Sequence, residues 1–218
     1  DKGVRVSTVL AEQYKEDNKK NSLIYSGLFN STSGINRLNQ FIQGEKITKD
    51  INPHYGSIQK LHARNTDLIT FCEDKVLRVL ANKDALFNAD GNPQLTATNR
   101  VLGQAVPYVG EYGISKNPES FASYAYRVYF ADKNRGAILR LSRDGLTPIS
   151  DLGMKDFFKD TLPKSDLILG SYDDSKGLFN LTLDGQTVSF DEKVNGFPSF
   201  KSFIPEGALS LNNIYYSI

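Results

Sequence analysis

The residue types that most often bind metals or act as nucleophiles are scarce in this sequence. His54 and His62 are its only histidines, and Cys72 is its only cysteine. The eight-residue spacing of the histidines matches no zinc-binding motif. Cys72 ends the apolar run at residues 68–72, where we expect a small buried side chain, and a single cysteine excludes an intramolecular disulfide. We therefore predict no metal ligand among these residues.

Two pairs of adjacent acids are the next candidates for chemistry, because glycoside hydrolysis uses two carboxyl groups. The pairs are Glu73 with Asp74, and Asp173 with Asp174. A glycosidase holds its two acids across a cleft, about 5–10 Å apart, whereas both pairs here fall in polar turns, which favour short acidic side chains. Residues 171–177 are similar to the aspartate box of sialidases, itself a structural turn, but the chain has no tryptophan. A calcium ion would need about 6–8 oxygen ligands, more than this loop supplies.

Composition and motifs exclude several further classes of function. The nucleophile elbow, the dinucleotide-binding glycine pattern and the P-loop are all absent. With 26 basic and 25 acidic residues the net charge is +1. The chain therefore lacks the excess of positive charge that tight, sequence-independent binding to nucleic-acid phosphates requires. No run approaches the ~18 apolar residues of a membrane span. We predict no enzyme, catalytic residue, metal or cofactor. Because the chain starts at Asp1 without Met or a signal peptide, we also expect a piece excised from a longer protein.

A repeat of about 41 residues predicts the elements that must position any site. Four segments share a pattern of strand, polar turn and strand, with turns at 34, 75, 136 and 177. Successive turns are 41, 61 and 41 residues apart, so we place about twenty extra residues at 89–121. Residues 208–218 look like the start of another unit. The whole chain, 1–218, is expected to be one domain.

Turn chemistry favours antiparallel hairpins within each unit. Asp144-Gly145 and Asp184-Gly185 lie between short alternating runs, and Asp-Gly supplies the positive φ angles of tight hairpins. Pro148 cannot donate to a ladder, so its strand should lie at an edge. Four short strands per ~40–50 residues indicate a β-propeller, or part of one, built from antiparallel blades. A β-sandwich is the alternative.

Two short helices are expected between the strands. At residues 117–120 a capping residue precedes proline at the first helical position and an acid in the first turn. At residues 153–162 the apolar side chains share one face, and the helix should stop before Pro163. Both are too short to be stable alone, so we expect them to dock on the sheets.

Several strings resemble tail structural proteins of short-tailed bacteriophages. They are residues 104–122 (QAVPYVGEYGISKNPESFA), 135–150 (RGAILRLSRDGLTPIS) followed by Gly153-Met154, 39–50 (NQFIQGEKITKD) and 55–60 (YGSIQK). The family includes the stabilisation, nozzle and muzzle proteins of crAss-like and related phages. The resemblance covers roughly residues 4–160, and beyond 163 only the repeat remains.

The resemblance implies a structural role in the virion tail and no reaction. It implies a propeller in a homo-oligomeric ring below the portal and adaptor, part of a hub or nozzle wall through which genomic DNA passes as cargo. The protein would be made in the bacterial cytoplasm and would dock other tail subunits and appendages. The rival hypothesis is a propeller that binds or cleaves a host-surface glycan.

The long segment at 104–122 is the best candidate contact loop. It is aromatic, rich in glycine and longer than a blade needs, and such loops on rigid scaffolds often bind partners. We single out Tyr108, Glu111, Tyr112 and Lys116 as possible protein contacts, since tyrosine is enriched at interfaces. The alternative, left open by the sequence, is that both tyrosines cover the edge of their own sheet.

Overall fold

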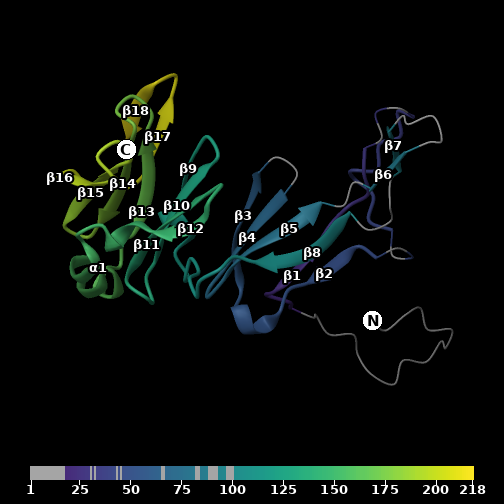
Figure 1. Ribbon diagram of the computed structural model, residues 1–218, viewed down its shortest axis with the longest axis horizontal. Helices are drawn as coiled ribbons and strands as arrows, with labels where there is room; N and C mark the ends of the chain where they lie inside the picture. The colour runs from purple at the N-terminus through teal and green to yellow at the C-terminus, as the bar shows by residue number, and fades with distance from the viewer. Residues whose placement is uncertain are drawn as a thin grey trace.

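Three four-stranded antiparallel sheets follow one another along the chain in the computed structural model (Figure 1). The structure describes residues 18–29, 31, 33–42, 44, 46–64, 67–81, 84–87, 93–96 and 101–218. The first sheet contains β3 (Ile58–Arg64), β4 (Asp67–Cys72), β5 (Val76–Ala81) and β8 (Leu102–Pro107). The second contains β9 (Ala122–Tyr124), β10 (Arg127–Asp132), β11 (Ala137–Ser142) and β12 (Gly145–Pro148). The third contains β13 (Leu169–Asp173), β14 (Leu178–Leu183), β15 (Gln186–Asp191) and β16 (Gly196–Lys201).

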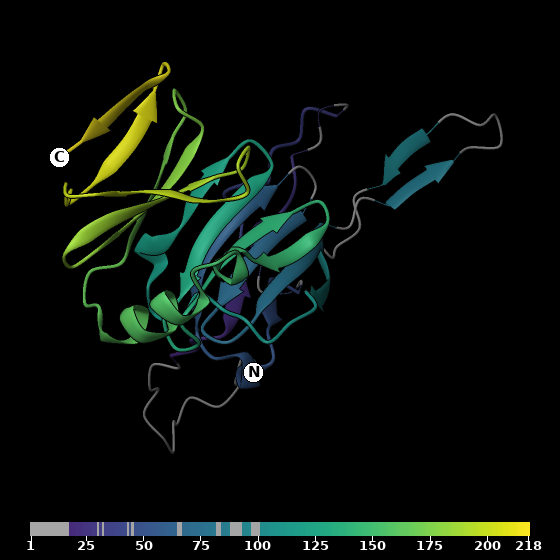
Figure 2. The same cartoon turned by 60° about the vertical axis from the view of Figure 1, so that its left-hand side comes forward.

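Three two-stranded ladders accompany these sheets. They are β1 (Ser22–Ile24) with β2 (Thr48–Asp50), β6 (Asp84–Phe87) with β7 (Pro93–Thr96), and β17 (Ala208–Leu211) with β18 (Ile214–Ser217). The β17–β18 pair, here called the C-terminal hairpin, lies beyond the third sheet (Figures 1 and 2). Residues 208–218 therefore form an antiparallel hairpin, and that they begin another unit stays a prediction. The β6–β7 hairpin projects away from the body of the molecule (Figure 2).

The sheets pack face to face because their central strands are apolar on both faces. In β10, Val128 and Phe130 point into the cluster shared with the first sheet, whereas Tyr129 and Ala131 point into the cluster shared with the third. Successive side chains of a strand alternate between its faces, so one continuous apolar run serves two cores. A third cluster lies on the far face of the first sheet and includes Cys72, which is buried as predicted.

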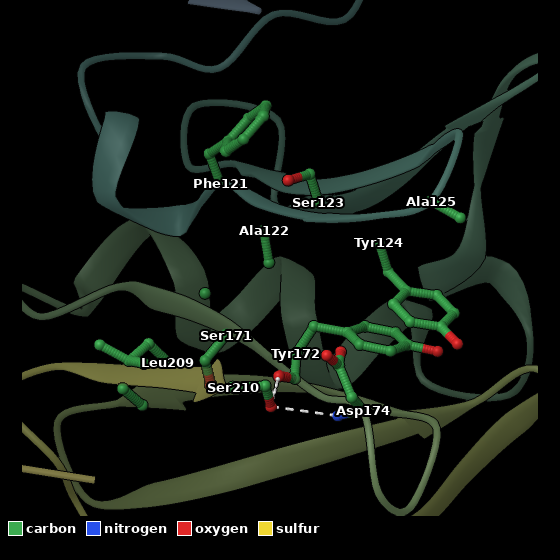
Figure 3. Close-up of a pocket in the computed structure, with 12 residues that line it drawn as sticks. Phe121, Ala122, Ser123, Tyr124, Ala125, Ser171, Tyr172, Asp174, Leu209 and Ser210 are labelled. Carbon is green, nitrogen blue, oxygen red and sulfur yellow. Dashed lines mark hydrogen bonds between the residues drawn. The ribbon is translucent and has the colours of Figure 1, made fainter. Parts of the chain in front are cut away.

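The first strands of the second sheet, the third sheet and the C-terminal hairpin lie side by side. β13 packs against β9 on one side and β17 on the other, and these three strands, with their flanking residues, line a pocket of about 590 Å³ (Figure 3). The fourth strands, β12 and β16, form the opposite edges of their sheets. Pro148 lies in β12, which pairs only with β11, so the predicted edge position is confirmed.

The 41-residue spacing marks a recurring turn and not the step between sheets. Gly136 (φ 63°) follows the second strand of its sheet, whereas Gly177 (φ 68°) follows the first strand of the next. In both turns an aspartate Oδ1 accepts the N–H three residues later, at Asp132 and at Asp173. The two sequences are therefore alike because they build the same turn, although the turn joins different pairs of strands.

The predicted first unit differs most from the expected pattern. The turn at Gly34 lies between β1 and β2, where the described residues form one isolated bridge, Phe29 to Asn36, and no four-stranded sheet. The predicted insertion is also divided. Within the predicted insertion at 89–121, Pro93–Thr96 form β7, Leu102–Pro107 form β8 of the first sheet, and residues 108–121 form the loop that follows β8.

The two predicted helices are present in shorter form. Residues Pro118–Ser120 make a single 3-10 turn, so the first is not an α-helix. The second is α1 (Lys155–Thr161), which ends before Pro163 as predicted and continues as a 3-10 turn at Leu162–Lys164. Two further 3-10 turns lie at Pro53–Tyr55 and Ile149–Asp151. Phe158 and Leu162 are buried in the cluster between the second and third sheets, where docking stabilises so short a helix.

The all-β class is confirmed, and each complete sheet has the four antiparallel strands of a propeller blade. The described sheets form a row with two free ends. The closed propeller stays a prediction.

Candidate interaction surface

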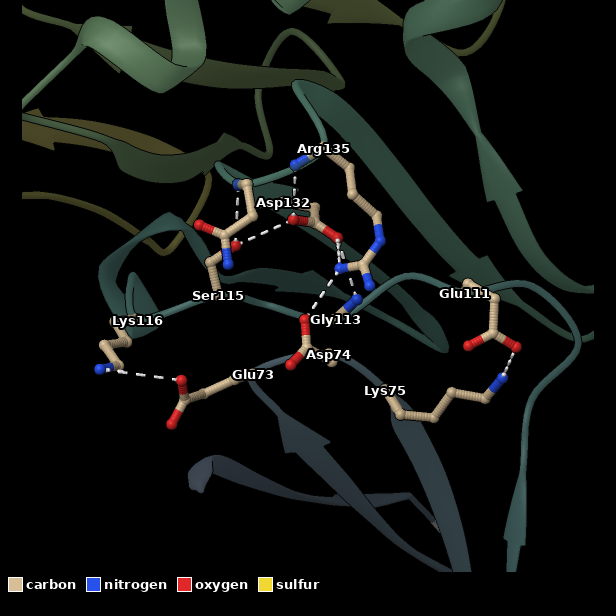
Figure 4. Close-up of polar contacts among 10 residues, drawn as sticks. Glu73, Asp74, Lys75, Glu111, Gly113, Ser115, Lys116, Asp132 and Arg135 are labelled. Carbon is tan, nitrogen blue, oxygen red and sulfur yellow. Dashed lines mark hydrogen bonds and ion pairs between the residues drawn. The ribbon is translucent and has the colours of Figure 1, made fainter. Parts of the chain in front are cut away.

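A buried carboxylate fastens the loop at residues 108–121 to the two sheets beneath it (Figure 4). Asp132, fully buried at the end of β10, accepts hydrogen bonds from the Gly113 N–H (3.1 Å) and the Ser115 hydroxyl (2.9 Å). It also accepts from the backbone N–H and the guanidinium of Arg135, both at 3.1 Å. Because a buried charge is costly unless it is fully paired, these contacts fix the course of the loop.

The acidic pair Glu73 and Asp74 takes part in the same network. The Arg135 guanidinium bridges from Asp132 to Asp74 (3.2 Å), which joins the β4–β5 turn to the second sheet. Glu73 accepts from the backbone N–H and the hydroxyl of Ser57, and these hydrogen bonds hold its pKa below the usual value. Both acids therefore have structural partners, in agreement with their interpretation as turn residues.

The four predicted contact residues divide into two kinds. Tyr108 and Tyr112 are half-buried and pack against the cluster between the first and second sheets, and the Tyr108 hydroxyl accepts from the Arg64 guanidinium at 3.0 Å. Glu111 and Lys116 point outward, although Glu111 pairs with Lys75 at 2.7 Å (Figure 4) and Lys116 lies 3.8 Å from Glu73.

The tip of this loop carries an apolar residue that the sequence argument missed. Val109, between the two half-buried tyrosines, is 92% exposed. Its neighbour Glu111 has a side chain that is 82% exposed. The sequence signal that could have indicated this exposure is a β-branched residue next to a glycine in a turn. The described loop thus exposes Val109, Glu111 and Lys116 to solvent, while its tyrosines cover their own sheets.

The C-terminal hairpin presents a second apolar surface. Its inner face packs on the third sheet, where the Ser210 hydroxyl donates to the Tyr172 carbonyl (2.8 Å) and Tyr215 shares a hydrogen bond with Ser171 (2.8 Å). Its outer face carries four exposed apolar side chains: Leu209, Leu211, Ile214 and Tyr216. Both cross-strand pairs on this face are apolar, which is unusual for a surface that stays in water.

The remaining candidates have packing or turn roles. His62 lies on β3 with its ring 5.2 Å from that of Phe121, and its pKa is lowered by burial and by the nearby Arg64 and Lys60. His54 lies in the 3-10 turn at Pro53–Tyr55. Across the described residues, no three histidine, cysteine or acidic side chains are grouped so that they could hold a metal.

A trio of one buried and two partly exposed side chains, which the sequence did not reveal, links the second and third sheets. The Tyr129 hydroxyl donates to Glu192 Oε1 (2.7 Å), and Arg140 donates to Glu192 Oε2 (2.8 Å). Burial, followed by the hydrogen bond to Glu192, raises the Tyr129 pKa far above its usual value. The aromatic ring stacks on Phe179 with centroids 4.8 Å apart. Tyr129 is fully buried, so this trio braces the interface and offers no access to a substrate.

Comparison with known proteins gives the family. Residues 47–218, more than half of the chain, match the model of the Crassvirus muzzle protein family. The matched segment contains the three four-stranded sheets, the loop at 108–121 and the C-terminal hairpin. No curated protein matches the sequence. Of the helices in the described part of the chain, none has the length and apolar character needed to cross a membrane. The chain therefore belongs to the Crassvirus muzzle protein family.

Proposed function

We propose that this chain is a structural component of a phage tail, part of the hub or nozzle wall around the channel through which DNA leaves. Membership of the muzzle protein family carries the proposal. The protein acts through contacts with other tail subunits, including portal, adaptor and appendage proteins. Its place is the virion tail, after synthesis in the bacterial cytoplasm. Catalysis has no part in this role.

The architecture we propose is a β-propeller. Three features support it: four-stranded antiparallel sheets that follow chain order, face-to-face packing of consecutive sheets, and first strands gathered side by side. In a propeller the first strands surround the central axis and the fourth strands lie at the rim. The apolar outer face of the C-terminal hairpin is what the next blade would cover.

A ring of subunits is the assembly we propose for the complete protein. Each subunit contact should bury more than about 1,000 Å² of total surface. The loop tip at Val109, Glu111 and Lys116 supplies an apolar centre with charges of both signs beside it, and this composition suits a protein contact. The near-neutral chain, with a net charge of +1, suits a wall past which DNA slides without binding tightly.

Immunogold electron microscopy of intact virions tests this role. Antibodies raised against this chain should label the tail, and antibodies against the major capsid protein serve as the matched control. Gold particles on the capsid, or absence of the protein from purified virions by mass spectrometry, would refute the proposal.

A photo-crosslinking amino acid at position 109 tests the contact surface. In assembled tails it should crosslink to another tail subunit, because Val109 is the most exposed large apolar side chain of the loop. The same amino acid at position 144, an exposed hairpin turn of the second sheet, provides the comparison. Equal crosslinking from both positions would show that the loop has no special contact role.

A further inference from the structure

The pocket between the first strands of the second and third sheets and the C-terminal hairpin has features of a ligand site. Its volume is about 590 Å³, and its lining comes from β9, β13 and β17 with their adjoining turns. Pockets of about 300–1,000 Å³ are typical of small-molecule sites. The lining combines aromatic rings, hydroxyl groups and one carboxylate (Figure 3).

Two tyrosines form a rigid aromatic platform at one side of the pocket. The rings of Tyr124 and Tyr172 are nearly parallel (13°), with centroids 4.2 Å apart (Figure 3). Tyr172 is 8% exposed and also stacks toward Tyr129, whereas Tyr124 is 38% exposed. Tyr172 thus supports one face of the Tyr124 ring, and within the described residues no other ring covers the opposite face.

Several polar groups of the pocket are left without an internal partner. Among the described residues, the Asp174 carboxylate and the hydroxyls of Ser123, Tyr124 and Tyr172 make no hydrogen bond to the protein. Burial, followed by the neighbouring Tyr124, raises the Tyr172 pKa to about 12, so its hydroxyl stays protonated and can donate. The backbone N–H of Asp174 is held by the Ser210 hydroxyl at 3.1 Å, which fixes the loop that carries the carboxylate.

We propose that this pocket binds a neutral sugar ring. The apolar face of a pyranose stacks on an open aromatic ring, while adjacent sugar hydroxyls donate to a carboxylate, and such charge-assisted hydrogen bonds are about twice as strong as neutral ones. Tyrosine and serine hydroxyls can both donate and accept. The set of Tyr124, Tyr172 and Asp174 therefore matches a polyhydroxylated ring on one face and along one edge (Figure 3).

The charges around the pocket argue for a neutral ligand. The Arg127 guanidinium acts on the pKa of the pocket residue Tyr172, and the Asp174 carboxylate lines the pocket itself. With charges of both signs beside it, the pocket has no single-sign field that would select an ion. Hydrolysis is not part of the proposal, because the second acid, Asp173, is 3% exposed and accepts from Ser175 and Lys176 within its turn.

Saturation-transfer NMR and calorimetry with this chain test the proposal. The probes are the methyl pyranosides of glucose, galactose and mannose, and methyl N-acetylglucosaminide. At least one should bind with a dissociation constant of about 1 mM. Tyr124→Ala should weaken that binding about tenfold, and the isosteric Asp174→Asn should weaken it about fivefold. Tyr216→Ala, which removes an exposed tyrosine on the outer face of the C-terminal hairpin, is the matched control and should bind as the parent chain does.

Two results would overturn the sugar site. The first is failure of all four glycosides to bind at about 20 mM, well above the expected constant. The second is binding that Tyr124→Ala and Asp174→Asn leave unchanged while circular dichroism shows both variants folded. Neither result bears on the tail role, because that proposal rests on the family and is tested by labelling of virions.

Discussion

Removing the carboxylate of Asp132 should destabilise the protein more than any other single acid-to-amide change in the described residues. Asp132 is fully buried and accepts four hydrogen bonds: from the Gly113 and Arg135 N–H groups, the Ser115 hydroxyl and the Arg135 guanidinium. Asp132→Asn keeps the shape of the side chain. It leaves the Arg135 charge without its buried partner, and it turns an amide N–H₂ toward one set of donors.

The size of the effect follows from these contacts. Breaking a buried ion pair by removing one partner costs about 3–5 kcal/mol, but Arg135 is partly exposed and keeps a second partner in Asp74. Water around the Arg135 guanidinium therefore offsets part of this loss of stability. A donor left facing another donor adds about 1–3 kcal/mol. We expect Asp132→Asn to lower the free energy of unfolding by about 3 kcal/mol.

Urea unfolding followed by circular dichroism measures this difference as a shift in midpoint. Asp144→Asn is the control, because that acid lies exposed in a hairpin turn and should change stability by less than about 0.5 kcal/mol. Hydrogen exchange adds a local readout: amides at residues 108–121 should lose protection in Asp132→Asn before those of β10 do. A loss below about 1 kcal/mol, or unchanged protection of the loop, would refute the view that this carboxylate holds the loop in place.

Three further predictions concern other parts of the core. Tyr129→Phe should lower the free energy of unfolding by about 1–2 kcal/mol at pH 7. Because the Tyr129 pKa is raised in the folded state, the parent chain should lose stability as the pH rises above about 10. A melting temperature of the variant that falls equally steeply with alkali would contradict this. Gly170→Ala should lower the free energy of unfolding, measured with urea, by about 3 kcal/mol, because a Cβ there would lie 1.9 Å from the Ser120 carbonyl oxygen. A decrease below about 1 kcal/mol would mean that the sheets move apart easily to make room. Cys72, buried with its pKa raised to about 11 by burial and Glu73, should react with a thiol reagent only at the rate of unfolding, and fast labelling of the native protein would contradict its burial.

Much of the local structure follows from the order of residues along the chain. Asp-Gly at 144–145 and 184–185 predicted where the turns between β11 and β12 and between β14 and β15 lie, although Gly145 (φ 105°) takes the expected positive φ and Gly185 does not. Pro148 predicted an edge strand, because proline lacks the N–H that a central strand must donate. The repeat of short strands separated by polar turns predicted the all-β class. These features depend on φ angles and hydrogen-bond donors within a few residues, and such short-range constraints can be read from sequence.

The assignment of strands to sheets could not be predicted in this way. The turns at Gly136 and Gly177 have the same local chemistry, yet one follows the second strand of a sheet and the other the first. Nothing within either turn distinguishes the two positions. Which strands pair is decided by the cores on both faces, through side chains such as Tyr129 and Phe130 that serve different clusters from adjacent positions.

In the candidate sites, too, features set by neighbouring residues could be predicted from the sequence, whereas features set by contacts between distant residues could not. Residue order alone specifies the chain's strand-forming character, its tight turns and its lack of recognisable catalytic motifs, and it predicts a candidate contact segment at 104–122. The packing of the sheets is what turns Tyr108 and Tyr112 inward and Val109 outward, and it brings Tyr124, Tyr172 and Asp174 to one pocket. The physical reason is distance along the chain. Asp132 meets Gly113, and Tyr124 meets Tyr172, across gaps that no local pattern specifies, because packing of whole sheets sets them.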